Sequence, residues 1–346
     1  MTDKKDIRIL TFNEVVNFCS KYNLPKFRAK QIWEWLWKKC ASSFEEMTSL
    51  SKEIRKLLHE HFSIKNIKVH NAERSLDGTI KYSFQLHDNL LIEGVLIKSK
   101  KRLTACISSQ VGCSLACKFC ATGTLKLERN VTASEIYAQV FILNNEALSH
   151  FGKPLTNIVY MGMGEPLLNY KHLLNSIHFI TSDEGLSISP KRITVSTAGI
   201  AKMIKKLADD QVKFNLAISL HSASEKKRNS LMPLNEKINL IELQEAVKYF
   251  YTKTGTRVTY EYILFKDLND KIEDAQNLIK FAKKIPCKIN LIEYNSVENL
   301  SYQKSSNKVT ESFMQLLEKH KIIVNLRKSK GKDIAAACGQ LANKLQ

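Results

Sequence analysis

The sequence lacks the features that would place it in a membrane or outside the cell. No apolar run in its 346 residues approaches the length of a bilayer-spanning helix. The first residues, Met1–Asp6, lack the apolar segment that a signal peptide needs. Acidic residues are also few, with 34 Asp and Glu against 53 Lys and Arg. These absences predict a cytoplasmic protein with no membrane partner.

The excess of basic residues points to a phosphate-rich partner. The formal net charge is +19, which is more than solubility requires and is typical of nucleic-acid-binding proteins. A protein from a Lys-rich proteome would have the same charge, so the composition favours nucleic acid without establishing it. The apolar fraction of 44% is enough to build the core of one large domain and a smaller one.

Three of the eight cysteines lie close together in the sequence. Cys113, Cys117 and Cys120 are separated by three and then two residues, and no fourth ligand for tetrahedral zinc follows nearby. Three thiolates can instead hold three irons of a cubane iron–sulfur cluster and leave the fourth iron open to a ligand. Permanent disulfides are not expected in the reducing compartment that this cysteine usage indicates. The isolated cysteines are expected to be packing residues, namely Cys19, Cys40 and Cys287.

Residues 1–65 are predicted to form a small helical domain. In the segment 27–40, which follows Pro25, apolar side chains recur on one helical stripe that extends to Cys40. Trp35 projects away from this stripe, among several lysines. It could stack on an unpaired base or pack against the second domain.

Residues 66–98 are predicted to form a β bridge between two domains. Short alternating apolar runs indicate strands, and Asp77 followed by Gly78 is a turn signal between them. Glu93 lies inside one of these runs. The pattern alone favours a solvent-facing position for its carboxylate, although a partly buried one is the alternative.

Residues 99–346 alternate between strand-like and helical segments. This alternation predicts parallel βα units and an α/β fold, a partial or full parallel (β/α) barrel. The predicted strands are 156–162, 192–196, 214–220, 258–264, 287–292 and 322–326, and the predicted helices are near 132–148, 170–182, 200–208, 239–253, 270–284 and 308–319.

Polar residues follow several of the predicted strands, where the functional residues of such folds gather. They are Gly164 and Glu165 after the first strand, Ser196, then Ser219 and His221, and later Asn295. The glycine lets a ligand approach the backbone closely, and the carboxylate of Glu165 could accept hydrogen bonds from an ammonium group. An open iron beside this carboxylate would suit chelation of an amino acid.

The cysteine spacing together with Gly164 and Glu165 resembles the radical S-adenosylmethionine (SAM) superfamily. The motif order from about Glu93 to Leu341 closely resembles the dual-specificity ribosomal RNA and transfer RNA adenine-C2 methyltransferases, and residues 1–65 resemble their RNA-binding accessory domain. The resemblance implies a [4Fe-4S] cluster on Cys113, Cys117 and Cys120 and two SAM molecules per turnover. It also implies 23S rRNA and tRNA as substrates, an electron donor such as a flavodoxin or ferredoxin, and a monomer.

The resemblance also assigns roles to single residues. Cys338 would carry a methyl group as S-methylcysteine, Cys106 would release the product by forming a transient disulfide with Cys338, and Glu93 would remove the ring proton. Such a disulfide requires α-carbons within about 7 Å of each other. Contacts to SAM are implied for Gly164, Glu165, Ser196, Ser219, Leu220, His221 and Asn295. For His221, a core histidine with satisfied hydrogen bonds is the alternative.

Two other functions remain open at the level of sequence. One is methylation of carbon 8 of the same adenine, as in a related antibiotic-resistance family that shares the site. The other is a non-catalytic, metal-containing RNA-binding protein. The basic runs 98–102 and 327–332 are candidates for phosphate contacts, although such runs are also common on solvated faces.

Overall fold

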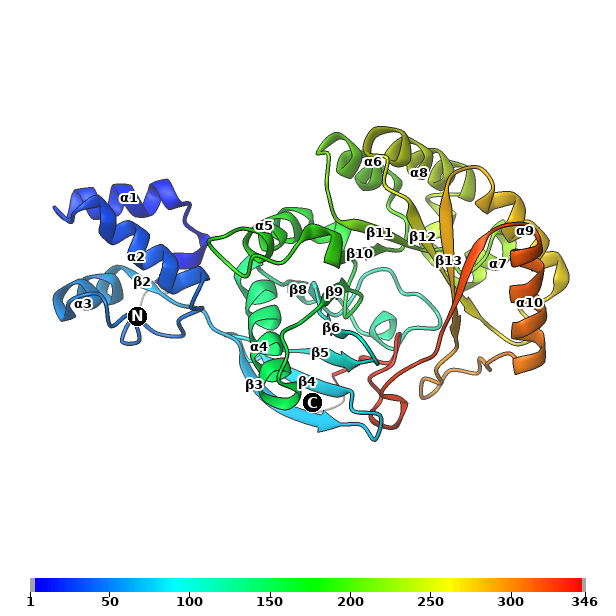
Figure 1. Ribbon diagram of the computed structural model, residues 1–346, viewed down its shortest axis with the longest axis horizontal. Helices are drawn as coiled ribbons and strands as arrows, with labels where there is room; N and C mark the ends of the chain where they lie inside the picture. The colour runs from blue at the N-terminus through cyan, green and yellow to red at the C-terminus, as the bar shows by residue number, and fades with distance from the viewer. Residues whose placement is uncertain (1–3, 344–346) are drawn as a thin grey trace.

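One open sheet of ten strands organises the computed structural model, which describes residues 4–343 (Figure 1). The strand order is β14-β13-β12-β11-β10-β9-β6-β5-β4-β3. Strands from β14 to β6 are parallel, whereas β5, β4 and β3 are antiparallel. Because β14 and β3 are the two edges of this sheet within residues 4–343, the predicted parallel barrel is confirmed in its partial form.

The parallel strands alternate with helices, as the sequence predicts. The strands are β6 (Leu103–Cys106), β9 (Asn157–Tyr160), β10 (Ile193–Thr197), β11 (Asn215–Ser219), β12 (Val258–Leu264), β13 (Cys287–Glu293) and β14 (Ile323–Arg327). The helices are α4 (Ala133–Phe151), α5 (Tyr170–Thr181), α6 (Ala201–Asp209), α7 (Glu225–Leu231), α8 (Leu240–Thr254), α9 (Ile272–Ala282) and α10 (Asn307–Lys319). The pattern does not predict β6 or α7, because each is too short to show a clear period.

Three antiparallel strands extend the sheet: β3 (Lys68–Arg74), β4 (Ile80–Gln85) and β5 (Leu91–Lys98). Since β5 pairs with β6, the segment expected as a β bridge is hydrogen-bonded directly to the parallel strands. The expected solvent-facing position of Glu93 is wrong, because this residue lies on β5 inside the sheet and is only 3% exposed. The division of the chain at residues 65 and 98 stays a prediction.

The N-terminal unit consists of α1 (Phe12–Lys21), α2 (Lys26–Trp37) and α3 (Lys52–His61). Helix α2 ends at Trp37, so Cys40 lies outside it, with a φ of 51°. Trp37 stacks on Phe179 of α5, with 3.4 Å between ring centroids and 4° between ring planes. Trp35 instead donates a hydrogen bond to Ser49 within the same unit. Trp37, and not Trp35, therefore joins the unit to the core.

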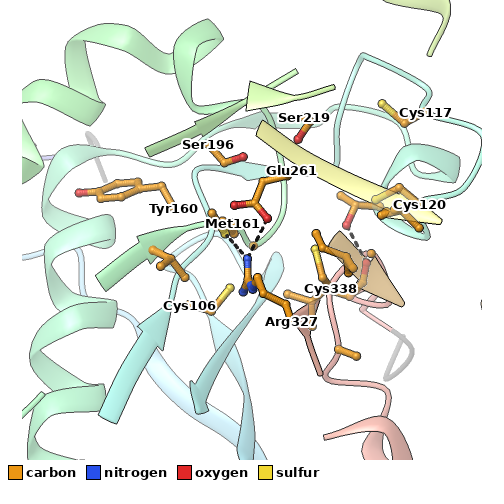
Figure 2. Close-up of a pocket in the computed structure, with 18 of the residues that line it drawn as sticks. Cys106, Cys117, Cys120, Tyr160, Met161, Ser196, Ser219, Glu261, Arg327 and Cys338 are labelled. Carbon is orange, nitrogen blue, oxygen red and sulfur yellow. Dashed lines mark hydrogen bonds and ion pairs between the residues drawn. The ribbon is translucent and has the colours of Figure 1, made fainter. Parts of the chain in front are cut away.

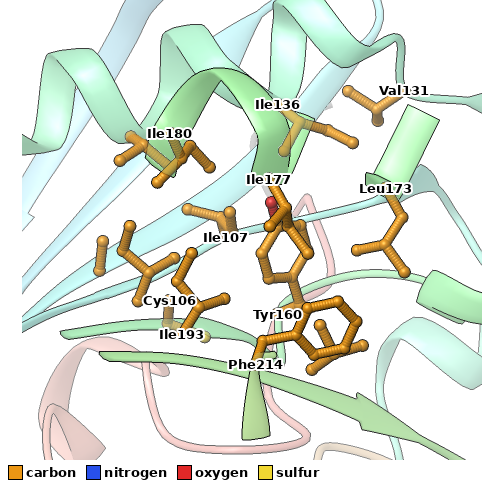
Figure 3. Packing of buried hydrophobic residues seen from close by; sticks show 14 of the residues in the cluster. Cys106, Ile107, Val131, Ile136, Tyr160, Leu173, Ile177, Ile180, Ile193 and Phe214 are labelled. Atoms are coloured by element: carbon orange, nitrogen blue, oxygen red, sulfur yellow. The ribbon is translucent and has the colours of Figure 1, made fainter. Parts of the chain in front are cut away.

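The main core lies between the parallel sheet and the helices α4 and α5. Figure 3 shows Ile107 and Tyr160 from the strand side packed with Ile136 of α4 and Ile177 of α5. These side chains are at most 7% exposed. Cys106 belongs to the same cluster. The core thus reaches the carboxyl ends of β6 and β9, where Cys106 and Tyr160 are the last strand residues.

Candidate active site

A cavity of about 410 Å³ lies at the carboxyl ends of the parallel strands (Figure 2). It is lined by residues that the sequence places far apart. Of the site residues expected from the sequence, those that line it are Cys106, Cys113, Cys117, Cys120, Gly164, Glu165, Ser196, Ser219, His221 and Cys338. Glu93, Leu220 and Asn295 lie outside its lining.

The three-cysteine loop is closed by a pair of short strands, β7 (Gln110–Val111) and β8 (Arg129–Asn130). Gly112 precedes Cys113 with a φ of 75°, and a Cβ at this position would lie 1.8 Å from the carbonyl oxygen of Lys126. Only glycine fits such a position without displacing backbone. On the far side of the loop, Lys118 N–H donates to the carbonyl of Leu231. The loop is therefore fixed at both ends and in its middle.

The three thiols suit a polynuclear cluster. No group of three or more His, Cys, Asp or Glu side chains within residues 4–343 is arranged to hold a metal ion. A cubane cluster attaches each thiolate to a different iron, and three thiols that line one cavity meet that requirement. Burial raises the pKa of Cys113 to about 11 and raises the pKa values of Cys117 and Cys120. A cluster held by these thiols would therefore release their protons on binding.

Gly164 and Glu165 form the turn after β9. Gly164 has a φ of 92°, and a Cβ there would clash with the side chain of Gln110, which comes from the cysteine loop. The carboxylate of Glu165 accepts hydrogen bonds from the N–H groups of Leu167 and Ala198. Burial raises the pKa of Glu165 to about 7, although these hydrogen bonds and Thr197 lower it. This carboxylate faces the cavity with a charge that changes near neutral pH.

The ends of β10 and β11 are tied together by a buried arginine. Arg228 of α7 donates hydrogen bonds to the carbonyls of Ala198, Ser219 and Leu220. Leu220 is fully buried and does not line the cavity. Ser219 carries one of these carbonyls, and Ser196 lies two residues before another. Both serines line the cavity.

His221 serves both the core and the cavity wall. Its Nδ1 accepts a hydrogen bond from the N–H of Ile263, and its carbonyl accepts one from Asn269. Burial, together with the charge of Arg228, lowers the pKa of His221 to about 3, so the ring is neutral. His221 is therefore a buried histidine with hydrogen-bond partners, which was the expected alternative, and it also lines the cavity.

Cys106 and Cys338 reach the cavity from opposite ends of the chain (Figure 2). Cys106 ends β6 and is 8% exposed, whereas Cys338 is exposed because it faces the open cavity. Burial, together with the nearby thiol of Cys338, raises the pKa of Cys106 to about 12, although Arg327 lowers it. Although part of Cys338 is open to the cavity, the protein packed around its thiol raises the pKa of that thiol to about 11, and Arg327 again acts in the opposite direction.

Arg327 and Glu261 complete the wall beside these cysteines. Nη1 of Arg327 lies 3.2 Å from Oε2 of Glu261 and 3.6 Å from Sδ of Met161. The other carboxylate oxygen of Glu261 accepts a hydrogen bond from Nδ2 of Asn290, at 2.8 Å. Sequence reasoning missed Glu261 and considered Arg327 only as a phosphate contact. A carboxylate within an apolar strand was the available signal, because such a residue needs a buried partner.

The segment that carries Cys338 is hydrogen-bonded to the cysteine loop. The N–H of Ala121 donates to the carbonyl of Gly339, and the hydroxyl of Thr122 donates to the carbonyl of Leu341, at 2.7 Å. Asn295 lies outside the cavity lining, but its Nδ2 donates to the carbonyl of Cys338, at 3.3 Å. The position of the Cys338 thiol is therefore coupled to that of the three-cysteine loop.

Glu93 lies outside the cavity lining and contacts the same C-terminal segment. Its Oε2 accepts hydrogen bonds from the N–H groups of Ala342, at 2.8 Å, and Asn343, at 3.3 Å. Its Oε1 lies 3.6 Å from Nζ of Lys81, which also pairs with Glu73. In this arrangement Glu93 anchors the chain a few residues beyond Cys338.

Sequence profiles of two known domains match this chain. The Ribosomal RNA large subunit methyltransferase N-terminal domain matches residues 6–64, and the Radical SAM superfamily matches residues 107–282. The second match covers the cysteine loop and half of the chain. Within residues 4–343, no helix is both long enough and apolar enough to cross a membrane.

Full-length relatives and one solved structure are similar to the whole chain. The "Probable dual-specificity RNA methyltransferase RlmN" of Christiangramia forsetii is 53% identical over 99% of this chain and 97% of its own length. The protein of the same name from Bacillus licheniformis is 40% identical over 99% of this chain and 95% of its own. A crystal structure of a radical SAM methyltransferase from Sphaerobacter thermophilus has a TM-score of 0.92 and 37% identity, covering 97% of this chain and 99% of that one.

Proposed function

Because the chain belongs to the RlmN family of radical SAM RNA methyltransferases, we propose that it methylates carbon 2 of one adenine in 23S rRNA and of an adenine next to the anticodon in certain tRNAs. The observation that supports this proposal best is the shared cavity. It brings Cys106 and Cys338 together with the three cysteines of the cluster-binding loop.

The chemistry of the target atom explains why such a site is needed. Carbon 2 of adenine is an electron-poor ring carbon, so it cannot attack the methyl group of SAM as a sulfur or nitrogen nucleophile does. Members of the superfamily use SAM and a four-iron cluster, which together supply a carbon-centred radical. In this chain Cys113, Cys117 and Cys120 would hold the cluster, while Glu165 and the strand ends would hold the methionine part of SAM.

Two SAM molecules would be used in each turnover. Cys338 takes a methyl group from the first as a thiolate nucleophile. The second, held by Glu165 and the strand ends beside the cluster, would supply the radical chemistry by which the methyl carbon on Cys338 becomes bonded to the adenine. Cys106 then forms a disulfide with Cys338 and releases the product. Glu93 takes the ring proton after its hydrogen bonds to Ala342 and Asn343 open.

The charge of the cavity rim fits an RNA substrate. Arg102, Arg327, Lys328 and Lys330 all line the cavity and can contact phosphates. The target base must leave its stack to enter, which favours loops in which unstacking costs little. A flavodoxin or ferredoxin as electron donor and a monomeric enzyme are further parts of this proposal.

Product analysis separates this function from methylation of carbon 8. Reconstituted enzyme would be incubated anaerobically with reductant, SAM and either 23S rRNA or tRNA, and the digested nucleosides would be compared with 2-methyladenosine and 8-methyladenosine standards by mass spectrometry. We expect 2-methyladenosine from both RNAs; 8-methyladenosine alone would contradict the proposal. The alternative of a non-catalytic RNA-binding protein does not agree with membership of this enzyme family.

A further inference from the structure

An ion pair between a partly exposed arginine and a buried carboxylate holds a positive charge beside the two cysteines of the cavity. Arg327 is the last residue of β14, and its guanidinium pairs with Glu261 of β12. Asn290 of β13 fixes the carboxylate in turn. Figure 2 shows the guanidinium between Cys106 and Cys338, with Met161 beside it. Three neighbouring strands thus fix the position of one cation.

Cys106 has little other support for a negative charge. Its thiol sits on β6, next to β9, and is surrounded by protein. Within residues 4–343, the charged or titratable groups that face it are Cys338 and Arg327, and the backbone N–H of Met161 also points toward it. A thiol attacks as the thiolate, and burial opposes that form. The positive charge of the Arg327 guanidinium favours the thiolate of Cys106 and so counteracts the effect of burial.

We propose that Arg327 makes Cys106 a competent nucleophile by compensating the charge of its thiolate, and that Glu261 is the positioning residue that holds Arg327 there. This inference rests on the proposed function, because it concerns the step that releases the product. A guanidinium stays protonated at any pH at which the enzyme works, so Arg327 acts as a fixed charge and not as a proton carrier.

The step is balanced without a further oxidant. The thiolate of Cys106 attacks Sγ of Cys338 while that sulfur is still bonded to the methylene carbon on the adenine. The Sγ–Sγ bond forms and the Sγ–carbon bond breaks, so the two sulfurs are oxidised and the carbon is reduced. The carbon keeps the electron pair and takes a proton to become the methyl group. A cellular dithiol would then reduce the disulfide.

Alkylation of Cys106 tests this role without RNA or turnover. Full-length, cluster-loaded protein carrying Cys338→Ala would be treated anaerobically with iodoacetamide between pH 7 and 10, and modification of Cys106 would be followed by site-resolved mass spectrometry. The added changes are Arg327→Met, Arg327→Lys and, as a matched control, Lys328→Met, which removes a neighbouring cation that also lines the cavity. Thermal melting would show whether each variant is folded.

We expect Arg327→Met to slow alkylation of Cys106 at least about tenfold at pH 8, since one pKa unit corresponds to a tenfold change. Arg327→Lys should recover most of the rate, and Lys328→Met should leave it unchanged. Alkylation at the parent rate in folded Arg327→Met would overturn the proposal. The same result is expected if Arg327 serves only to bind RNA, because no RNA is present in this experiment.

Turnover with Cys338 intact gives a second readout. Arg327→Met should accumulate a covalent adduct between Cys338 and RNA, because release becomes slow. Release of methylated RNA at the wild-type rate would contradict the role of Arg327 and leave the proposed function standing. Methylation of RNA by the Cys338→Ala variant would instead contradict the proposed function, because the methyl group would not pass through Cys338.

Discussion

The carboxylate of Asp333 accepts a hydrogen bond of 2.6 Å from the hydroxyl of Ser75, across 258 residues of sequence. Asp333 also accepts one from the N–H of Leu76, and the adjacent Asp77 accepts one from the N–H of Gly331. The turn between β3 and β4 thereby holds the segment that leads to Cys338, as Figure 1 shows for the red C-terminal loop and the cyan hairpin.

These hydrogen bonds, called the clasp below, predict that a substitution outside the cavity lowers activity. Asp333→Ala should free the segment before Cys338 and lower kcat by roughly ten- to a hundredfold, since misplacing a reacting group by 1 Å can cost that much. Ser75→Ala removes only one of the hydrogen bonds and should have a smaller effect. Iron content and the visible spectrum should not change in either variant. Wild-type kcat in Asp333→Ala would show that the clasp does not position Cys338.

Glu165 predicts that SAM binding depends on pH. Burial raises the pKa of Glu165 to about 7, above its ordinary value of 4.5. An ammonium group binds the carboxylate form, so affinity should fall as the pH drops through 7 and level off above it. Anaerobic equilibrium dialysis of cluster-loaded protein should show about tenfold weaker binding at pH 6 than at pH 8. Glu165→Gln should bind more weakly at both; an unchanged pH dependence in this variant would assign the effect to another group.

Two of the three tryptophans of α2, Trp35 and Trp37, should differ in their contribution to stability. Trp37 is 1% exposed and stacks on Phe179, so Trp37→Ala should lower the free energy of unfolding by roughly 3–5 kcal/mol. Trp35 is partly exposed and contacts Ser49 and Lys39, so Trp35→Ala should cost less than about 1 kcal/mol. Urea unfolding followed by circular dichroism measures both. Equal losses would mean that α2 does not join the core through Trp37.

The parallel strands and their polar ends can be predicted from the sequence, because the spacing of apolar residues along each segment is a local property. Once the strands are parallel, their carboxyl ends meet, which brings Glu165, Ser196 and Ser219 to one edge of the sheet. The environments of single residues could not be predicted in this way. Glu93 is buried because β5 lies inside the sheet, and the contact of Ser75 with Asp333 joins segments that only the complete fold brings together. The ion-pair partner of Glu261 could not be predicted either, because nothing in the sequence of β12 indicates that Arg327 lies beside it.

The most direct test of the central claim is the fate of RNA in two cysteine variants. Reconstituted Cys106→Ala and Cys338→Ala would each be incubated with SAM, reductant and a substrate RNA, and the products resolved on denaturing gels and by nucleoside mass spectrometry. We predict a covalent protein–RNA adduct from Cys106→Ala and neither adduct nor methylated adenine from Cys338→Ala. Methylated adenine from Cys338→Ala would contradict the account, because the methyl group would then reach the base without passing through that sulfur.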